Sequence, residues 1–199
     1  MNVSYAISGA LFLLVALLSF SVWALGGRWF PNEPAMYAGC AIIFLGLGGA
    51  ALLPSKGRSG SRALSFCLSF AVSYTAYAFL WSVAWFTLPN TFGEILGSSF
   101  GLLAFAAILI RWNRLRIPLL VATSVLFFFH TFGYYLGGFT YLSLQGKGPL
   151  AVDMNLPQEQ VRLLARLSWG AGYGLGLGSG LVTLFYLSRQ SSERPSTHI

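Results

Sequence analysis

The charged residues of this 199-residue chain, 12 basic and 5 acidic, are all absent from six long stretches of sequence. A charged side chain at the centre of a bilayer costs at least about 2.5 kcal/mol, and a spanning helix needs about 20 mostly apolar residues. The pattern therefore predicts an all-α, polytopic transmembrane bundle of six helices. The uncharged stretches are residues 1–27, 34–55, 63–93, 95–110, 117–146 and 167–188.

We expect one membrane domain over residues 1–188 and a polar cytoplasmic tail over 189–199. Thr91 and Glu94 have the spacing of a capping box, which would start the short fourth helix at Thr91. Residues 156–166 have the pattern of a short amphipathic helix, which we expect on the membrane surface ahead of the last span. The expected spans are about 5–25, 35–53, 63–88, 91–110, 117–142 and 166–188.

Basic residues are concentrated at one end of the predicted bundle. That end has a net charge of +8 − 1 = +7, whereas the other end has +4 − 4 = 0. By the positive-inside rule the first end, with both termini, is cytoplasmic, so the charge does not indicate a nucleic-acid partner. The charges of the first end are Lys56, Arg58, Arg62, Arg111, Arg114, Arg116, Arg189, Glu193 and Arg194. Those of the second end are Arg28, Glu33, Glu94, Lys147, Asp153, Glu159, Arg162 and Arg166.

The last predicted span carries glycine at every second position. A dinucleotide-binding loop would need glycine at 175 or 177, and both are leucine. At helical spacing the glycines instead form two faces, roughly opposite, that allow close approach of neighbouring helices. We therefore expect this helix to be central and to lie between two others; a sliding or unwinding helix is the alternative. One face is Gly172, Gly176 and Gly180, and the other is Gly170, Gly174 and Gly178.

His130 is the one histidine within a predicted span. An ionisable side chain at that depth is a candidate functional residue. The alternative is a structural role, in which His130 forms a hydrogen bond between helices. A stripe on the third helix runs from serine to tryptophan at four-residue spacing and would line a path toward the neutral end. The candidate ligand site is His130 with Ser73, Tyr77, Ser179 and Tyr134; the stripe is Ser65, Ser69, Ser73, Tyr77, Trp81 and Trp85.

Tryptophan and tyrosine gather near the neutral end, which is typical of an interfacial aromatic belt and would also suit an outward-facing vestibule.

Cys40 and Cys67 are expected at different depths, too far apart for a disulfide, and neither has the spacing of a metal ligand. No cofactor is indicated. The expected surroundings are a bilayer, specifically the bacterial cytoplasmic (inner) membrane, with other membrane proteins or further copies of the chain as candidate partners.

Gly97-Ser98-Ser99-Phe100-Gly101 has the letters of a nucleophile motif but no strand before it. Six helices, internal termini, a serine early in helix 4 and a glycine-rich helix 6 resemble the rhomboid intramembrane proteases. That resemblance implies a base histidine in helix 6, where this chain has none, and a histidine and an asparagine in helix 2, which are also missing. A serine without a base is a poor nucleophile.

The favoured hypothesis is a non-enzymatic membrane protein that binds or moves a small neutral or apolar solute through an outward-opening site near mid-membrane. No predicted span contains Asp, Glu, Lys or Arg near the middle of the membrane, which argues against carboxylate proton relays and Schiff-base chemistry. Two alternatives stay open: a non-catalytic structural or assembly subunit of a larger membrane complex, and a rhomboid-like protease or its inactive relative.

Overall fold

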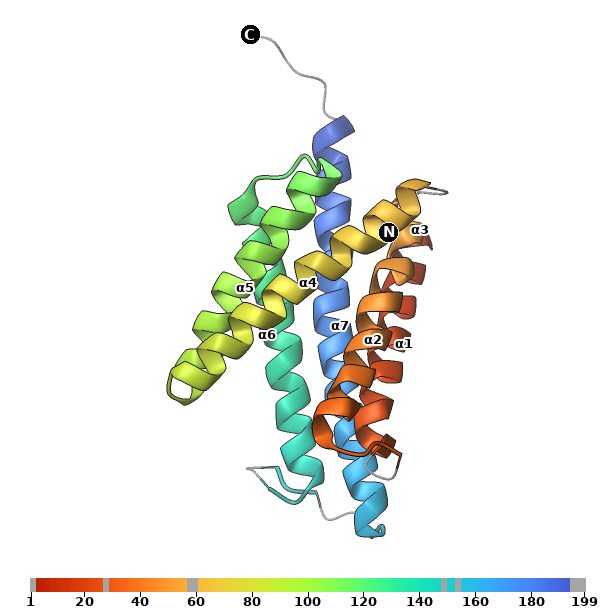
Figure 1. Ribbon diagram of the computed structural model, residues 1–199, viewed down its shortest axis with the longest axis vertical. Helices are drawn as coiled ribbons and strands as arrows, with labels where there is room; N and C mark the ends of the chain where they lie inside the picture. The colour runs from red at the N-terminus through yellow and green to blue at the C-terminus, as the bar shows by residue number, and fades with distance from the viewer. Residues whose placement is uncertain (1–2, 27–28, 57–60, 148–149, 153–154, 194–199) are drawn as a thin grey trace.

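The computed structural model describes the chain except for residues 1–2, 27–28, 57–60, 148–149, 153–154 and 194–199 (Figure 1). Every regular element of the described residues is an α-helix, so the prediction of an all-helical bundle is confirmed. Predictions about Arg28, Arg58, Asp153 and the tail from residue 194 lie outside the described residues. The helices are α1 (Val3–Leu25), α2 (Glu33–Ala51), α3 (Leu53–Lys56), α4 (Ser61–Thr87), α5 (Asn90–Asn113), α6 (Leu119–Leu144) and α7 (Gln158–Glu193).

The six long helices form a ring in which each helix packs mainly against two neighbours. The order around the ring is α1, α2, α4, α5, α6 and α7, and α7 returns to α1. Helix α4 runs obliquely: it lies beside α2 at its N-terminal end and diverges from α2 toward its C-terminal end, together with α5 (Figure 1). We call the end with the loops after α1, α4 and α6 the aromatic end, and the opposite end the basic end.

Five helices are long and apolar enough to cross a membrane, and their large apolar side chains are widely exposed on the outside. The remaining long helix, α7, falls outside this group because its glycines and serines add little hydropathy. Two of its faces are covered by protein, and between Gly170 and Ser188 only Leu175, Ser179 and Tyr186 are exposed. The five apolar segments are Val3–Leu25, Glu33–Lys56, Arg62–Thr87, Thr91–Asn113 and Leu119–Leu144.

The two glycine faces of α7 lie against different helices. A Cβ atom added at Gly176 would lie 2.5 Å from the carbonyl oxygen of Phe129 and 2.7 Å from the Cα of Gly133, both on α6. One added at Gly174 would lie 2.6 Å from the Cβ of Ala16 on α1. Because the first contacts are with backbone atoms, a side chain at Gly176 could not be accommodated without separating α6 from α7. Gly172 and Gly180 also face α6, and Gly170 and Gly178 also face α1.

The starts of two helices differ from the sequence-based expectation. The capping-box prediction is wrong: α5 begins at Asn90 with Pro89 as its N-cap, and no side chain caps it. Glu94 is instead used by α6, as described below. The amphipathic segment is not a separate surface helix either, because α7 starts at Gln158 and continues without a break. No glycine or proline between Gln158 and Trp169 interrupts it.

The half of the bundle nearer the basic end has a packed core. Aromatic rings interlock there, with Phe12 and Phe70 6.0 Å apart and Phe70 and Phe105 6.0 Å apart between ring centroids. Fully buried side chains from five helices fill this core and leave no room for a ligand. A ligand site is therefore to be sought in the other half of the bundle. These side chains include Phe12, Phe66, Phe70, Leu102, Phe105, Leu109, Leu126, Leu177, Leu181 and Leu184.

Candidate functional site

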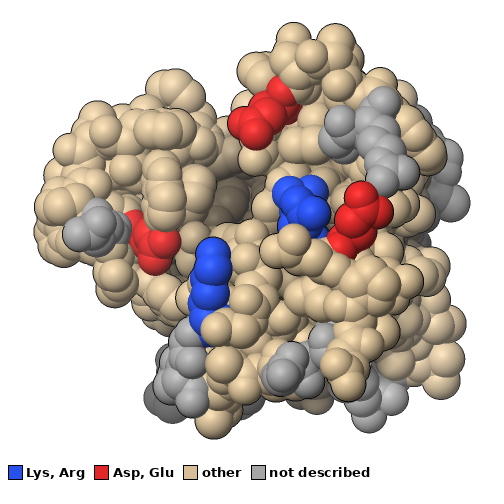
Figure 2. Space-filling model, turned by 90° about the horizontal axis from the view of Figure 1, so that it is seen from below, with Lys and Arg blue, Asp and Glu red and all other residues tan. Residues whose placement is uncertain are grey.

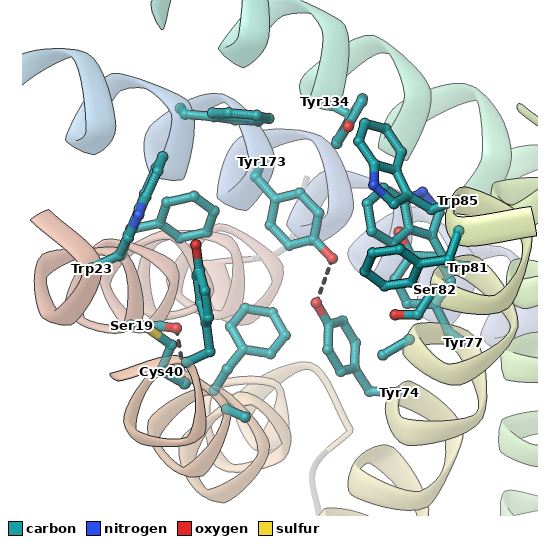
Figure 3. A pocket seen from close by; sticks show the side chains of 17 residues that line it. Ser19, Trp23, Cys40, Tyr74, Tyr77, Trp81, Ser82, Trp85, Tyr134 and Tyr173 are labelled. Carbon is teal, nitrogen blue, oxygen red and sulfur yellow. Dashed lines mark hydrogen bonds between the residues drawn. The ribbon is translucent and has the colours of Figure 1, made fainter. Parts of the chain in front are cut away.

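A cavity of about 650 Å³ occupies the half of the bundle nearer the aromatic end (Figure 3). Seen from that end, the molecule is hollowed between a lobe on one side and the remaining helices (Figure 2). Helices α1, α2, α4, α6 and α7 all contribute to the cavity wall, and none of the lining side chains is charged. The aromatic lining residues are Phe20, Trp23, Tyr37, Phe44, Tyr74, Tyr77, Trp81, Trp85, Phe86, Tyr134, Trp169 and Tyr173.

Tyr74, Tyr77 and Tyr173 form the floor of this cavity, and His130 lies directly behind them. The hydroxyl of Tyr77 is 2.6 Å from Nε2 of His130, and the hydroxyls of Tyr74 and Tyr173 are 2.7 Å apart. The two pairs pack together, with ring centroids 5.4 Å apart for Tyr74 and Tyr77 and 5.5 Å apart for His130 and Tyr173. The floor therefore joins α4, α6 and α7 through polar contacts in an otherwise apolar bundle.

His130 is only 1% exposed and lies behind the floor. Tyr77, Tyr134 and Tyr173 separate it from the cavity, and the Tyr134 ring stacks on the imidazole at 6.0 Å. Its Nδ1 atom has no hydrogen-bond partner among the described residues. His130 therefore sets the position of Tyr77 and completes its hydrogen bonding, while the tyrosines face the cavity.

The structure groups three of the five predicted site residues. Tyr77 and Tyr134 both contact His130, as the helical spacing suggested. Ser73 is buried, but its hydroxyl donates to the carbonyl of Ser69 at 2.7 Å and it does not line the cavity. Ser179 is exposed on α7, away from both glycine faces. Of the predicted residues, His130, Tyr77 and Tyr134 therefore belong to the site, whereas Ser73 and Ser179 do not.

Tyr74 and Tyr173 were missed by the sequence reasoning, as was the whole wall from α1 and α2. Tyr173 is the only aromatic residue between Gly170 and Gly180, which was an available signal. Tyr74 lies one turn from Tyr77 on the same helix. Trp23 and Phe20 could not be separated from an interfacial aromatic belt by composition alone.

Two charged side chains contact residues at the edge of the aromatic wall. The guanidinium of Arg166 donates to the Trp23 carbonyl at 2.8 Å and lies 4.8 Å over the Trp23 ring. The carboxylate of Glu94 accepts hydrogen bonds from Tyr134 at 3.3 Å and from Tyr135 at 3.1 Å. These contacts tie α7 to α1 and α5 to α6, and they leave the cavity itself without charge.

Among the described residues, one buried hydrogen-bond donor of the cavity wall lacks an acceptor. The indole Nε1 of Trp81 is buried and has no hydrogen-bond partner among the described residues. The Trp81 ring stacks on Trp85 with centroids 5.1 Å apart, which continues the predicted stripe toward the aromatic end. A buried donor without a partner is costly, so this indole is held in place at some loss of stability.

The serine of the nucleophile-like motif has no catalytic partner in the described part of the chain. The hydroxyl of Ser99 donates to the carbonyl of Ile95 at 2.8 Å, and His130 is bonded to Tyr77 instead. The motif's glycines serve packing: added Cβ atoms at Gly97 and Gly101 would lie 3.0 Å from the Cα of Trp81 and 2.9 Å from the carbonyl oxygen of Tyr77. This spacing lets α5 approach α4 closely.

Both cysteines are free thiols, and only Cys40 lines the cavity. Cys67 lies on α4 against Gly49 of α2, toward the basic end.

No family model, curated protein or solved structure matches the chain. Its function is therefore argued from the geometry and chemistry of the cavity.

Proposed function

We propose that the protein is an integral membrane protein with six spans, and that α7 is the sixth. The five apolar helices support the membrane assignment. Helix α7 runs the length of the bundle between α1 and α6, so the bilayer that surrounds those helices also surrounds it (Figure 1). Among described residues, the basic end carries Lys56, Arg62, Arg111, Arg114, Arg116 and Arg189. Under the positive-inside rule that end, with both termini, is cytoplasmic.

We further propose that the cavity binds a small neutral or apolar ligand. The observation that carries this proposal is a 650 Å³ cavity whose lining contains aromatic rings, several hydroxyls and no charge. Its volume falls in the range of sites for drug-sized ligands, which are mostly apolar with a few placed polar groups. An ion buried there would lack a counter-charge and would pay a large desolvation cost. Flat rings would instead stack on the aromatic wall.

The cavity favours a binding role over a purely structural one. Protein interiors are normally packed about as densely as organic crystals, and the half nearer the basic end follows that rule. A bundle that served only as an assembly subunit would have no need of an aromatic cavity in its other half. The packed core closes the cavity toward the cytoplasmic side. In this conformation the ligand therefore enters the cavity from the aromatic end.

His130→Ala should abolish ligand binding. The substitution leaves the hydroxyl of Tyr77 without its partner at 2.6 Å and opens a void beneath the floor. Binding can be measured with 1-aminoanthracene, a neutral fluorescent ring compound, titrated into protein in lipid nanodiscs and followed by energy transfer from tryptophan. The wild-type protein should bind the probe saturably, with one molecule per chain.

Two further variants separate a site effect from a folding effect. Tyr77→Phe keeps the ring and opens no void, so it should weaken binding at a cost of about 1–3 kcal/mol in stability, because Nε2 of His130 loses its partner. Ser124→Ala changes an exposed residue on the same helix as His130 and should bind like the wild type. Unchanged binding by His130→Ala, or no saturable binding by the wild-type protein, would refute the proposed site.

A further inference from the structure

The most exposed part of the cavity wall belongs to two of its five helices. Four lining residues are exposed, namely Tyr37 and Ala41 on α2 and Trp85 and Phe86 on α4. The lining residues of α1, α6 and α7 are all buried or half-buried. The opening of the cavity therefore lies between α2 and α4.

Close packing holds α2 and α4 together only at the basic end. An added Cβ at Gly49 would lie 2.7 Å from the Cα of Cys67, so the two backbones touch there. Midway along, the rings of Phe44 and Tyr74 still meet, with centroids 4.6 Å apart. Beyond that point α4 leans away from α2 toward the aromatic end (Figure 1). The gap is thus a slot that widens toward one membrane surface.

The rim of this slot suits the membrane better than water. Phe86 is 84% exposed and Tyr37 is 52% exposed, and the neighbouring Ile42 is 72% exposed. Tyr37 and Phe86 are close to the ends of their helices, at the depth where aromatic side chains meet lipid headgroups. The lining residues on both sides of the slot are uncharged, so no side chain there would attract or hold an ionic ligand.

We propose that the ligand is a neutral, ring-bearing, membrane-dissolved molecule that enters sideways from the leaflet at the aromatic end, between α2 and α4. This inference rests on the proposed function and specifies its ligand class and route. The rings of the ligand stack against the aromatic wall.

Cys40 reports on this route because its side chain lines the cavity. In a Cys67→Ser background reconstituted into liposomes, it is the only thiol of the chain. Pyrenylmaleimide, a neutral ring compound dissolved in the bilayer, should label Cys40 readily. A charged, water-confined reagent, trimethylammonium-ethyl methanethiosulfonate, should label it much more slowly.

Ala41→Trp places an indole in the slot and should slow pyrenylmaleimide labelling at least about tenfold, equivalent to about 1.4 kcal/mol in the entry barrier. Ala50→Trp adds the same side chain at an exposed position of α2 that does not line the cavity, and should not slow labelling. Ala78→Trp blocks the slot from α4 and should repeat the Ala41→Trp result. All variants should label equally once unfolded in detergent.

The outcomes separate this inference from the proposed function. Equal labelling by the charged reagent, or unslowed labelling in both slot variants, would overturn the membrane route. If 1-aminoanthracene still bound in those samples, the proposed function would stand without the route. Absence of 1-aminoanthracene binding to the wild-type protein would overturn the proposed function itself.

Discussion

Alanine substitutions at the adjacent glycines Gly137 and Gly138 should have opposite effects on stability. A Cβ at Gly137 would lie 2.7 Å from Cδ1 of Trp169 and 2.9 Å from the Trp169 carbonyl oxygen. A Cβ at Gly138 would meet nothing within 4 Å. The same change on the same helix therefore tests a backbone contact directly.

The magnitude follows from the distances. Non-bonded carbon atoms prefer about 3.5–4.0 Å, so α6 and α7 would have to separate by several tenths of an ångström at Gly137. Trp169 cannot simply rotate away, because its ring packs against Trp23 at 5.9 Å and Tyr141 at 5.2 Å between centroids. Overpacking of this kind costs about 1–3 kcal/mol, whereas alanine at an open helical glycine gains up to about 1 kcal/mol.

Gly137→Ala and Gly138→Ala should therefore differ by about 1–4 kcal/mol in free energy of unfolding. Reversible unfolding by sodium dodecyl sulphate in mixed micelles, followed by circular dichroism, measures that difference. Since Trp169 lines the cavity, Gly137→Ala should also weaken 1-aminoanthracene binding. Equal stability of the two variants would refute the account of α6 and α7 as helices whose backbones are in close contact.

Two further changes test how the C-terminal end of α5 is held. Arg114 has a left-handed backbone conformation at the C-cap of α5, with φ 51° and ψ 47°. Arg114→Gly should raise the free energy of unfolding by up to about 1 kcal/mol in the same assay, because glycine adopts this conformation without strain; a loss would contradict this. Asn113 is buried and donates to the Ser69 hydroxyl of α4 at 2.8 Å. Asn113→Ala should lower the free energy of unfolding by about 1 kcal/mol. An unchanged midpoint of the unfolding transition would show that this hydrogen bond contributes nothing to stability.

The packing of α7 between two helices was predictable, because the spacing of its glycines determines which faces of the helix they occupy. Glycine at every second residue places three on each of two faces, and the structure sets those faces against α1 and α6. Tyr77, Tyr134 and His130 were also predictable as neighbours, because each lies at a similar depth and faces inward. Long-range contacts of this kind follow from depth and helical phase alone.

The rest of the site depended on helix tilt and neighbour order, which the sequence did not reveal. The lean of α4 away from α2 creates the slot and brings Trp23 and Cys40 to the cavity wall. Ser179 has the right depth, but its helical phase between the two glycine faces turns it outward. Glu94 fitted a local capping pattern, yet the Tyr134 and Tyr135 hydroxyls on α6 bind its carboxylate instead.

The central claim is that the aromatic cavity holds a neutral ring-bearing ligand, and the two native cysteines test it within one molecule. Cys40 lines the cavity and Cys67 does not. Saturating 1-aminoanthracene should slow N-ethylmaleimide modification of Cys40 in nanodiscs and leave the rate at Cys67 unchanged. Equal rates at Cys40 with and without the compound, or equal slowing at both cysteines, would contradict the claim.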